Sequence, residues 1–354
     1  MKTCHIISDL DSFGGAQNLV VTICSQNNRD NLIYTLFPLE GFLFKKAIKD
    51  GINVERITFF IYIKLLIKGF NRKVRFHFHL SHAFYFSLLL PFGDKFYTEH
   101  STTNKRREKK IITLIDKFII YRTFNCITCI SKSVQNSLIR YLNPVKVNTT
   151  VAYNSTNPIY QISKSAKDNL LESRLKTMKI KPIITMIARF ADSKDQLTLI
   201  RALSNIPKAE LYLIGPGNNS KVLKEIYDKK LLQRVHLPGQ FESDRIKDLL
   251  KKTHVYVQSS NWEGFGLAPL EAMSMAVPTI VNSIDGLNEI SPTPELIFST
   301  GNFNELARKI NLLINDYEQY KFYSKLCWEN SKRFSREALI SSILRSYKDY
   351  CLDN

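Results

Sequence analysis

Two glutamates with seven residues between them are the strongest chemical signal in the sequence. Residues 261–273 read Asn-Trp-Glu-Gly-Phe-Gly-Leu-Ala-Pro-Leu-Glu-Ala-Met, so Glu263 and Glu271 bracket Gly264 and Gly266. The segment follows an expected strand and leads into an apolar helical stretch, the junction where parallel sheets bind ligands. Glycine there lets a ligand approach the backbone, and two carboxylates can accept hydrogen bonds from sugar or ribose hydroxyls. The structural alternative is one helix-capping glutamate and one exposed glutamate.

A pair of cations occupies a similar position earlier in the same half of the chain. Arg189 ends the expected strand at 183–188, and Lys194 follows five positions later. An arginine and a lysine at the mouth of a strand form a clamp suited to a diphosphate. The alternative is that both are ordinary surface cations on a loop.

The first half of the chain carries a glycine pair at the start of an expected helix. Gly14 and Gly15 lie in Ser-Phe-Gly-Gly-Ala-Gln, residues 12–17, between the first expected strand and a helix over 16–24. Glycines at a helix N-terminus form a generic anion site, so this signal alone is weak.

Besides His5 in the first expected strand, four histidines of the first half lie on or just after expected strands. His100 follows Tyr97-Thr-Glu, and the other three stand together as His77, His79 and His82. Their i, i+2, i+5 spacing matches no known zinc pattern, so no metal site is expected. Packing and a role in a cleft both remain open for the cluster, and for His100 a purely structural role is the alternative.

The elements that must position these residues alternate between short apolar runs and amphipathic stretches. This βαβ rhythm predicts parallel sheets in an α/β protein. The expected strands are at 5–8, 32–37, 74–79, 95–98 and 126–130, then at 183–188, 210–214, 234–237, 254–258 and 278–281. A polar stretch without strand pattern separates the two sets, so we expect two domains, 1–160 and 181–335, joined by a linker at 161–180. A C-terminal helix at 336–354 is expected to pack back on the first domain.

Charge is unevenly distributed along the 354 residues. The chain has 50 Lys+Arg against 32 Asp+Glu, a formal net charge of +18, and residues 1–150 hold 22 of the basic and 10 of the acidic groups. A basic first half indicates an anionic partner: membrane headgroups, nucleic acid or a phosphorylated substrate. Residues 59–73 interleave aromatic and basic side chains, and more cations stand at 105–110, so this half could lie on an anionic bilayer. A solvated basic surface is the plain alternative.

Composition excludes several other classes. With 44% hydrophobic and 23% charged residues, the chain is expected to be globular rather than disordered. No apolar run reaches the ~18 residues of a membrane span and no signal peptide is recognised at the start. The expected location is therefore the cytoplasm, either free or peripheral on the inner face of the cytoplasmic membrane. Cys126 and Cys129 form a CxxC without a second ligand pair, in a run typical of a buried strand, so we expect them to be core residues.

The second half resembles a known enzyme family. The matching segments are Val-His-Leu-Pro-Gly at 235–239, Val-Tyr-Val-Gln-Ser-Ser at 255–260, the two-glutamate block, Ala-Val-Pro at 276–278 and Asp-Gly-Leu-Asn-Glu at 285–289. Together they resemble the retaining glycosyltransferases of family 4 (glycosyltransferase group 1, surface-polysaccharide type), and the resemblance extends over nearly the whole chain. It implies the α/β GT-B fold, in which two Rossmann-like doubly wound domains face a central cleft.

The resemblance also implies roles for individual residues. Glu263 would hold hydroxyls of the donor sugar and Glu271 the ribose of the nucleotide, while Arg189 and Lys194 would hold the diphosphate. His100 would contact the donor sugar or its phosphate side. Backbone groups near the donor are implied at Gly264, Phe265, Gly266, Leu267, Gly215 and Gly239, and the acceptor cleft at Gly14, Gly15 and His79.

The sequence departs from the family pattern at three positions. Ala276 and Ser155 stand where glycine is usual, and Gln17 replaces an acidic residue common after the glycine pair. None of these changes removes a charge assigned to chemistry, although Gln17 affects the acceptor side.

The expected function is therefore a metal-independent, retaining hexosyltransferase. It would move a sugar from a nucleotide-diphosphate sugar to a glycan or lipid-diphosphate-linked saccharide, in capsule, lipopolysaccharide or exopolysaccharide biosynthesis. A nucleotide-sugar epimerase on the same scaffold would differ by acting without an acceptor. A nucleic-acid-binding protein would need helix-turn-helix, RRM or zinc signatures, and the sequence shows none, so no nucleic-acid partner is expected.

Overall fold

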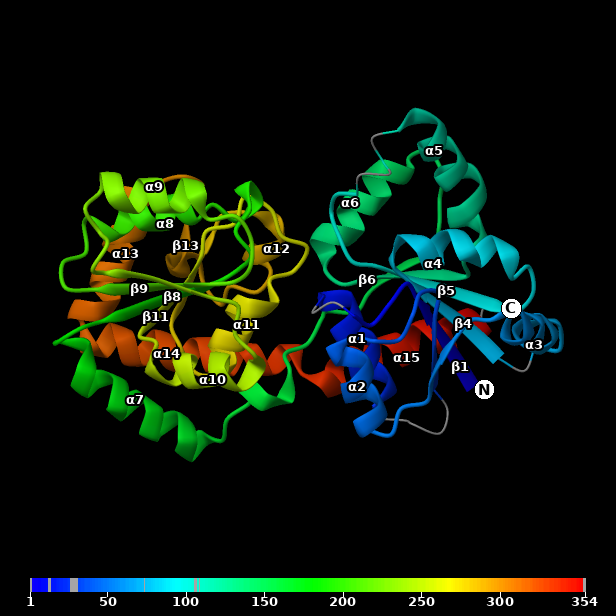
Figure 1. The fold of residues 1–354 in the computed structure, drawn as a ribbon, viewed down its shortest axis with the longest axis horizontal. Coiled ribbons are helices and arrows are strands. Elements are labelled where there is room, and N and C mark those ends of the chain that lie inside the picture. Colours follow the sequence, from blue (N-terminus) through cyan, green and yellow to red (C-terminus); the bar gives the residue numbers. More distant parts are fainter. Residues whose placement is uncertain are drawn as a thin grey trace. The chain divides into compact units, whose positions relative to one another are not determined.

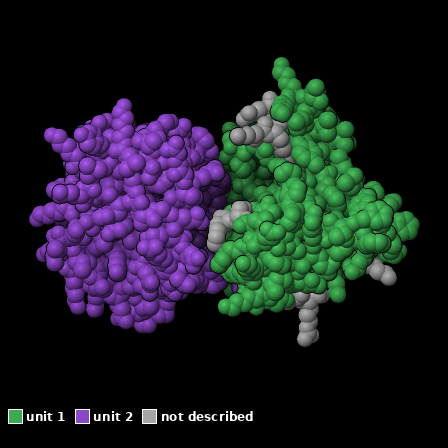
Figure 2. All heavy atoms as spheres, in the orientation of Figure 1, with its two compact units in different colours: residues 1–154, 337–354 green, residues 155–336 purple. Residues whose placement is uncertain are grey.

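The chain folds into two compact units, shown separately coloured in Figure 2. The computed structural model describes residues 2–11, 14–25, 31–72, 74–104, 107 and 109–352. Unit 1 comprises Met1–Asn154 and Glu337–Asn354, and unit 2 comprises Ser155–Arg336. The boundary thus falls a few residues before the predicted one, and the C-terminal segment is grouped with unit 1.

Unit 1 is built on a seven-stranded, wholly parallel sheet of order β3-β2-β1-β4-β5-β6-β7 (Figure 1). Its strands are β1 (Lys2–Ile7), β2 (Asn31–Thr35), β3 (Val54–Arg56), β4 (Val74–His79), β5 (Asp94–Glu99), β6 (Cys126–Cys129) and β7 (Thr149–Val151). Its helices are α1 (Gly15–Cys24), α2 (Phe42–Lys49), α3 (Phe59–Phe70), α4 (Leu80–Phe86), α5 (Lys110–Ile115), α6 (Lys132–Leu142) and α15 (Arg336–Leu352), with a π-helical turn η3 (Asp116–Ile120) after α5. The five predicted strands are confirmed. The short strands β3 and β7 were missed because three residues show no recognisable alternation.

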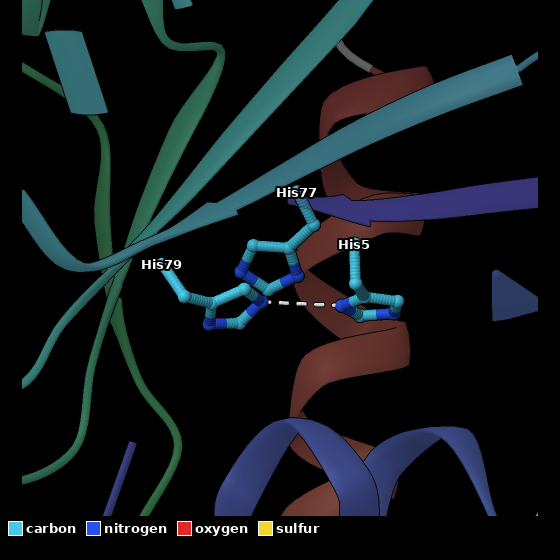
Figure 3. A group of neighbouring side chains, drawn as sticks. All are labelled: His5, His77 and His79. Atoms are coloured by element: carbon cyan, nitrogen blue, oxygen red, sulfur yellow. Dashed lines mark hydrogen bonds between the residues drawn. The ribbon is translucent and has the colours of Figure 1, made fainter. Parts of the chain in front are cut away.

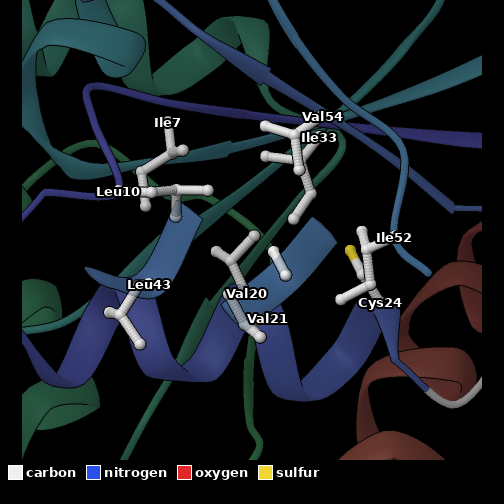
Figure 4. Close-up of a cluster of buried hydrophobic side chains, with 10 residues drawn as sticks. Ile7, Leu10, Val20, Val21, Cys24, Ile33, Leu43, Ile52 and Val54 are labelled. Carbon is white, nitrogen blue, oxygen red and sulfur yellow. The ribbon is translucent and has the colours of Figure 1, made fainter. Parts of the chain in front are cut away.

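One face of this sheet is sealed by an apolar cluster under α1 and α2 (Figure 4). Val20, Val21 and Cys24 project from α1 toward Ile7 of β1 and Ile33 of β2. The spacing of the three α1 residues places them on one side of the helix, which is what fixes the helix against the sheet. The CxxC pair lies in β6, where all four residues are buried and neither cysteine forms a disulfide, in agreement with the predicted core role.

Unit 2 repeats the architecture with a six-stranded parallel sheet of order β10-β9-β8-β11-β12-β13. Its strands are β8 (Ile183–Ile187), β9 (Glu210–Ile214), β10 (Val235–Gly239), β11 (Val255–Gln258), β12 (Thr279–Asn282) and β13 (Ile297–Phe298). Its helices are α7 (Lys164–Met178), α8 (Gln196–Leu203), α9 (Ser220–Asp228), α10 (Ser243–Lys252), α11 (Leu267–Ser274), α12 (Asp285–Asn288), α13 (Phe303–Asn315) and α14 (Tyr317–Ser331). The order reverses between β8 and β11, so this unit has a switch point at which both neighbouring loops diverge.

The prediction that 161–180 is a linker is wrong. These residues form α7, which belongs to unit 2 and buries Arg174. The Arg174 guanidinium donates to the carbonyls of Leu250 at the end of α10 (3.0 Å) and of Met275 (2.9 Å) and Ala276 (2.8 Å) after α11. A cation at two helix C-termini satisfies carbonyls that have no partner inside the helix and complements both dipoles. The polar composition of this segment favoured a linker in the sequence. The structure shows a helix there because the Arg174 side chain is buried in unit 2.

Among the described residues, no helix combines the length and the apolar character that crossing a bilayer requires.

Candidate active site

The carboxyl edge of the unit 2 sheet brings Lys194 and Glu263 into contact. Lys194 ends the short turn after β8, and Glu263 lies in the loop between β11 and α11. Lys194 Nζ is 2.5 Å from Glu263 Oε1, and each side chain is 17% exposed. An ion pair this short and this little exposed is held in place rather than fluctuating on the surface. Two of the predicted site residues, 69 positions apart, thus share one site.

A chain of polar side chains fixes the orientation of Glu263. Its Oε1 also accepts hydrogen bonds from Ser260 Oγ (2.9 Å) and Gln258 Nε2 (3.2 Å). The Gln258 carbonyl oxygen accepts from the buried hydroxyl of Tyr256 (2.7 Å), which in turn accepts from the backbone N–H of Ile187 (3.1 Å). One carboxylate oxygen is therefore fully engaged. Sequence reasoning missed these residues, although Tyr256 and Gln258 alternate with two valines in β11, which is a period-2 signal.

Close packing requires glycine at two positions, one in this loop and one in α12 beside it. Gly266 has φ of +92° and is the N-cap of α11, so it provides no side chain to cap the first N–H groups of that helix. A Cβ on Gly266 would lie 2.7 Å from Leu287 Cδ2, and a Cβ on Gly286 would lie 2.3 Å from the Glu263 carbonyl oxygen. Gly264 and Leu267 flank this turn, whereas the Phe265 side chain is buried against Phe334. The N-terminus of α11 thus has no side-chain cap, and such a position is one at which an anion can bind.

Glu271 lies one turn into α11 and has a different environment from Glu263. Its side chain is partly exposed, and desolvation raises the pKa of its carboxyl to about 8. Charge interactions with Glu271 also contribute to raising the pKa values of Tyr160 and Tyr256, so two phenols lie near it. A desolvated carboxyl beside phenols is able to accept hydrogen bonds from a hydroxyl-rich ligand.

Arg189, Gly215 and Gly239 stand at the same edge, at the ends of β8, β9 and β10. Arg189 is exposed, and its carbonyl accepts a hydrogen bond from Gln196 Nε2 (3.0 Å). Gly215 packs on the preceding strand end: a Cβ there would lie 2.2 Å from the Ala188 carbonyl oxygen. The Gly215 N–H donates to the Gly239 carbonyl (3.0 Å). Gly215 and Gly239 support the shape of the sheet edge, and Arg189 adds an exposed cation to it.

The predicted residues of unit 1 also gather at the carboxyl edge of their sheet. His79 ends β4 and His100 follows β5, with ring centroids 5.9 Å apart. Gly14 is the N-cap of α1 and provides no side chain to cap the helix, and Gly15 begins it. Burial lowers the pKa of His100 to about 4, and its Nε2 is a buried atom with no hydrogen-bond partner among the described residues. Ser12 and Phe13 of the glycine loop, and Lys105 and Arg106, lie outside the described residues.

His79 belongs equally to a buried cluster with His5 and His77 (Figure 3). His5 Nδ1 and His79 Nε2 are 3.1 Å apart, and the three rings are fully buried. Both nitrogens of His77 are engaged, Nε2 by Thr98 Oγ1 (2.7 Å) and Nδ1 by the Tyr347 hydroxyl (2.5 Å) from α15. Ligand atoms of the three residues lie within 4.8 Å of one another, so the cluster has the composition of a metal site. The two hydrogen bonds of His77 give the cluster a packing role, because one of them joins His77 to the C-terminal helix α15.

The two parallel sheets, each ending in a polar edge, define a class: this is the GT-B fold. HepE of Anabaena, crystallised with UDP, has the same fold at a TM-score of 0.84 and 19% identity, covering 99% of this chain and all of that one.

Residues 171–326 match the family model described as Glycosyl transferases group 1, in agreement with the resemblance seen in the sequence. The chain is 27% identical over 272 residues to the gpi3 subunit of the phosphatidylinositol N-acetylglucosaminyltransferase of Schizosaccharomyces pombe, covering 73% of this chain and 56% of that protein. It is 28% identical over 205 residues to the UDP-Gal:alpha-D-GlcNAc-diphosphoundecaprenol alpha-1,3-galactosyltransferase of Escherichia coli, covering 54% and 52%. The first curated relatives are matched over 48–62% of their own lengths.

Proposed function

We propose that this protein transfers a sugar from a nucleotide-diphosphate sugar to a hydroxyl of a glycan or of a lipid-diphosphate-linked saccharide. The transfer retains the anomeric configuration, uses no metal ion and serves the synthesis of a surface polysaccharide such as capsule, lipopolysaccharide or exopolysaccharide. The family match and the names of the relatives support this proposal, since one relative is named for a UDP-sugar donor and a diphosphoundecaprenol acceptor.

The contact between Lys194 and Glu263 is the observation that carries the proposal. A cation and a carboxylate at one strand edge, next to an uncapped helix N-terminus, match the two ends of a sugar diphosphate. The cation and the helix N-terminus attract phosphate oxygens, and the carboxylate accepts hydrogen bonds from sugar hydroxyls. Because Oε1 of Glu263 is occupied by three donors, Oε2 is the atom assigned to the sugar.

The remaining residues of unit 2 complete the donor site. Arg189 adds a second cation at the diphosphate, and Glu271 accepts hydrogen bonds from the ribose hydroxyls. Backbone groups of 264–267 face the sugar and diphosphate, and Gly215 and Gly239 give the edge its shape. In unit 1, Gly14 and Gly15 serve the acceptor, and the unpartnered Nε2 of His100 contacts the donor sugar or its phosphate side. His79, which the sequence also assigned to the acceptor cleft, is fully buried and is given no acceptor role.

Rate acceleration in this proposal comes from stabilising the leaving diphosphate. Negative charge grows on the diphosphate as the sugar–oxygen bond breaks, and Arg189 and Lys194 are cations already positioned to neutralise it. These two side chains take the part that a metal ion would otherwise play. The leaving phosphate oxygen takes the proton of the acceptor hydroxyl while the acceptor oxygen bonds to the anomeric carbon. Because the acceptor attacks from the face that the diphosphate leaves, the anomeric configuration is retained.

A donor screen in EDTA tests the proposal. UDP-, GDP- and dTDP-sugars are added to purified protein in a thermal-shift assay, followed by mass spectrometry of products with lipid-linked acceptors. We expect stabilisation by one nucleotide family, loss of that shift in Glu271→Ala, and a product whose anomeric configuration by NMR equals that of the donor. Absence of any shift in folded protein, a requirement for added metal, or an inverted product would each contradict the corresponding part.

A further inference from the structure

Helix α3 of unit 1 presents an apolar face to solvent. Phe59, Phe60, Ile63, Ile67 and Phe70 are all exposed, Phe60 by 83%. At 100° per residue these five side chains fall within about one third of the helix circumference. We call this set the α3 face. A solvent-facing helix side normally carries charged or polar residues, so its composition is the reverse of what a soluble surface favours.

The opposite side of α3 is what holds the helix to the unit. Leu65 and Gly69 are buried, and the Tyr62 hydroxyl donates to the Leu89 carbonyl (3.0 Å). A Cβ on Gly69 would lie 2.8 Å from the Phe92 carbonyl oxygen, so the backbone is in close contact there. Rotation of α3 to hide its exposed face would break these contacts. The exposure is therefore built into the fold.

Positive charge borders the α3 face. Lys64 and Arg72 are exposed and Lys68 is half-buried, and no acidic residue occurs between 57 and 73. Phe92, Leu88 and Leu89 from the segment before β5 extend the exposed apolar surface, with the Phe92 ring 5.2 Å from that of Phe70. Apolar side chains flanked by cations fit an anionic bilayer surface, where the chains enter the headgroup region and the cations meet lipid phosphates.

A second helix of the same unit repeats the pattern. The exposed apolar residues of α5 and η3 follow i, i+3, i+4, i+7 and i+8 spacing and are Ile111, Leu114, Ile115, Phe118 and Ile119. Lys109, Lys110 and Arg122 are exposed beside them, whereas Asp116 is fully buried. We call this set the α5 face. Helix α3 connects β3 to β4, and α5 with η3 connects β5 to β6, so both connections run in the same direction across the sheet. Because crossovers between parallel strands are right-handed, both helices lie on the same side of the sheet.

We propose that unit 1 docks on the surface of an anionic phospholipid bilayer through the α3 face and the α5 face. With 12 residues, α3 is about 18 Å long, too short for the ~30 Å hydrocarbon core, so it lies in the interfacial plane. The inference rests on unit 1 alone and needs neither a donor nor transfer activity. It assigns an anionic lipid surface as the partner of the basic half of the chain.

Vesicle co-sedimentation of the full chain tests the docking. The probes are vesicles of phosphatidylcholine alone and of phosphatidylcholine mixed with phosphatidylglycerol. The variant Phe60→Glu/Ile67→Glu places two carboxylates on the α3 face, and Ile180→Glu/Phe322→Glu is the matched control, because both residues are exposed apolar residues of unit 2. We expect wild type and control to bind the mixed vesicles, with binding weakened by salt, and the α3 variant to bind at least about tenfold more weakly.

Three results would overturn the docking proposal. They are no sedimentation of the wild type with mixed vesicles, equal binding by the α3 variant and the control, and equal binding to both vesicle compositions. A concentration-dependent dimer of the wild type that is absent in the α3 variant, without vesicle binding, would assign the surface to a second copy of the chain instead. Circular dichroism of each variant establishes that it is folded before it is compared. Because no sugar nucleotide is present, failure here leaves the transferase proposal untouched.

Discussion

The polar edge of unit 2 and the histidine cluster of unit 1 are both built from ionisable side chains near the ends of parallel strands, yet they differ in charge. Lys194 and Glu263 remain partly exposed, and each has the other as a counter-charge. His5, His77 and His79 are sealed, and burial lowers the pKa of each below its ordinary value. The first set is a cation paired with a carboxylate at a partly exposed edge, whereas desolvation favours the neutral form of the second set. The first set is suited to binding a charged substrate and the second to holding a core.

Removing a charge from the unit 2 edge gives the largest expected effect. Lys194→Ala and Glu263→Ala should each lower turnover about a hundred- to a thousandfold, because the cation stabilises the leaving group and the carboxylate orients the sugar. Steady-state kinetics on the folded variants measures this. Lys221→Ala is the matched control, since Lys221 pairs with Asp192 in the same unit but both side chains are largely exposed. Wild-type turnover in either folded site variant would contradict the site assignment.

Acid should lower the stability of unit 1 because its buried histidines are neutral in the folded state. Above the ordinary pKa of 6.5 the imidazoles are neutral in both the folded and unfolded states, so they add no pH dependence. Below pH 6.5 the unfolded chain takes up protons that the folded cluster refuses, since burial lowers the pKa of His5 to about 3 and that of His100 to about 4. The free energy of unfolding of unit 1 should therefore fall steadily from pH 6.5 toward pH 4.

Urea unfolding followed by hydrogen exchange in β1 and β4 measures this pH dependence. Unit 2 is the internal comparison, because burial lowers the pKa of one of its histidines, His254, to about 4 as well. Its stability should fall less steeply than that of unit 1. Removing one proton-binding group with His5→Gln should reduce the slope for unit 1, whatever its effect at pH 7. An unchanged slope would show that the cluster is not the source.

The raised pKa of Glu271 predicts that nucleotide affinity depends on pH as pH approaches about 8, above the acid range in which the histidines act. Below a pKa of about 8 the free enzyme holds this carboxyl protonated, and ribose hydroxyls donate best to the ionised form. Affinity for the nucleotide identified by the donor screen should thus rise by up to about tenfold per pH unit as pH increases toward 8. Calorimetry in buffers of different ionisation enthalpy would detect the released proton. Glu271→Gln should bind more weakly and lose the pH dependence, and retention of it in that variant would assign the proton to another group.

The smallest effect is expected from the link between the histidine cluster and α15. Tyr347→Phe removes the hydroxyl bonded to His77 and leaves a buried nitrogen unpaired, which should cost about 1–3 kcal/mol of stability. The same change at the exposed Tyr227 is the control. Denaturant melts measure the loss, and kcat should remain at the wild-type value because Tyr347 lies in the core of unit 1. A large fall in kcat with unchanged stability would contradict the packing role.

Much of the fold was predictable because its signals are local. Ten of the strands were predicted because they are apolar runs between polar stretches. The two-glutamate block was recognised because its glycines and carboxylates lie within 13 residues. The left-handed φ of +55° at Ala276 even agrees with the glycine expected at that turn. The linker was mispredicted because a buried Arg174 and an exposed arginine look the same in a sequence.

What the sequence alone determined is the inventory: parallel strands, a glycine-bounded carboxylate pair, two cations at a strand mouth and histidines at strand ends. Only the tertiary structure decided which of these meet. It brought Lys194 to Glu263 across 69 residues and Tyr347 to His77 across 270, and it separated the neutral cluster from the charged edge. The physical reason is that charge state and contact depend on burial and on partners distant in the chain, which strand order in the sheet sets and local composition does not.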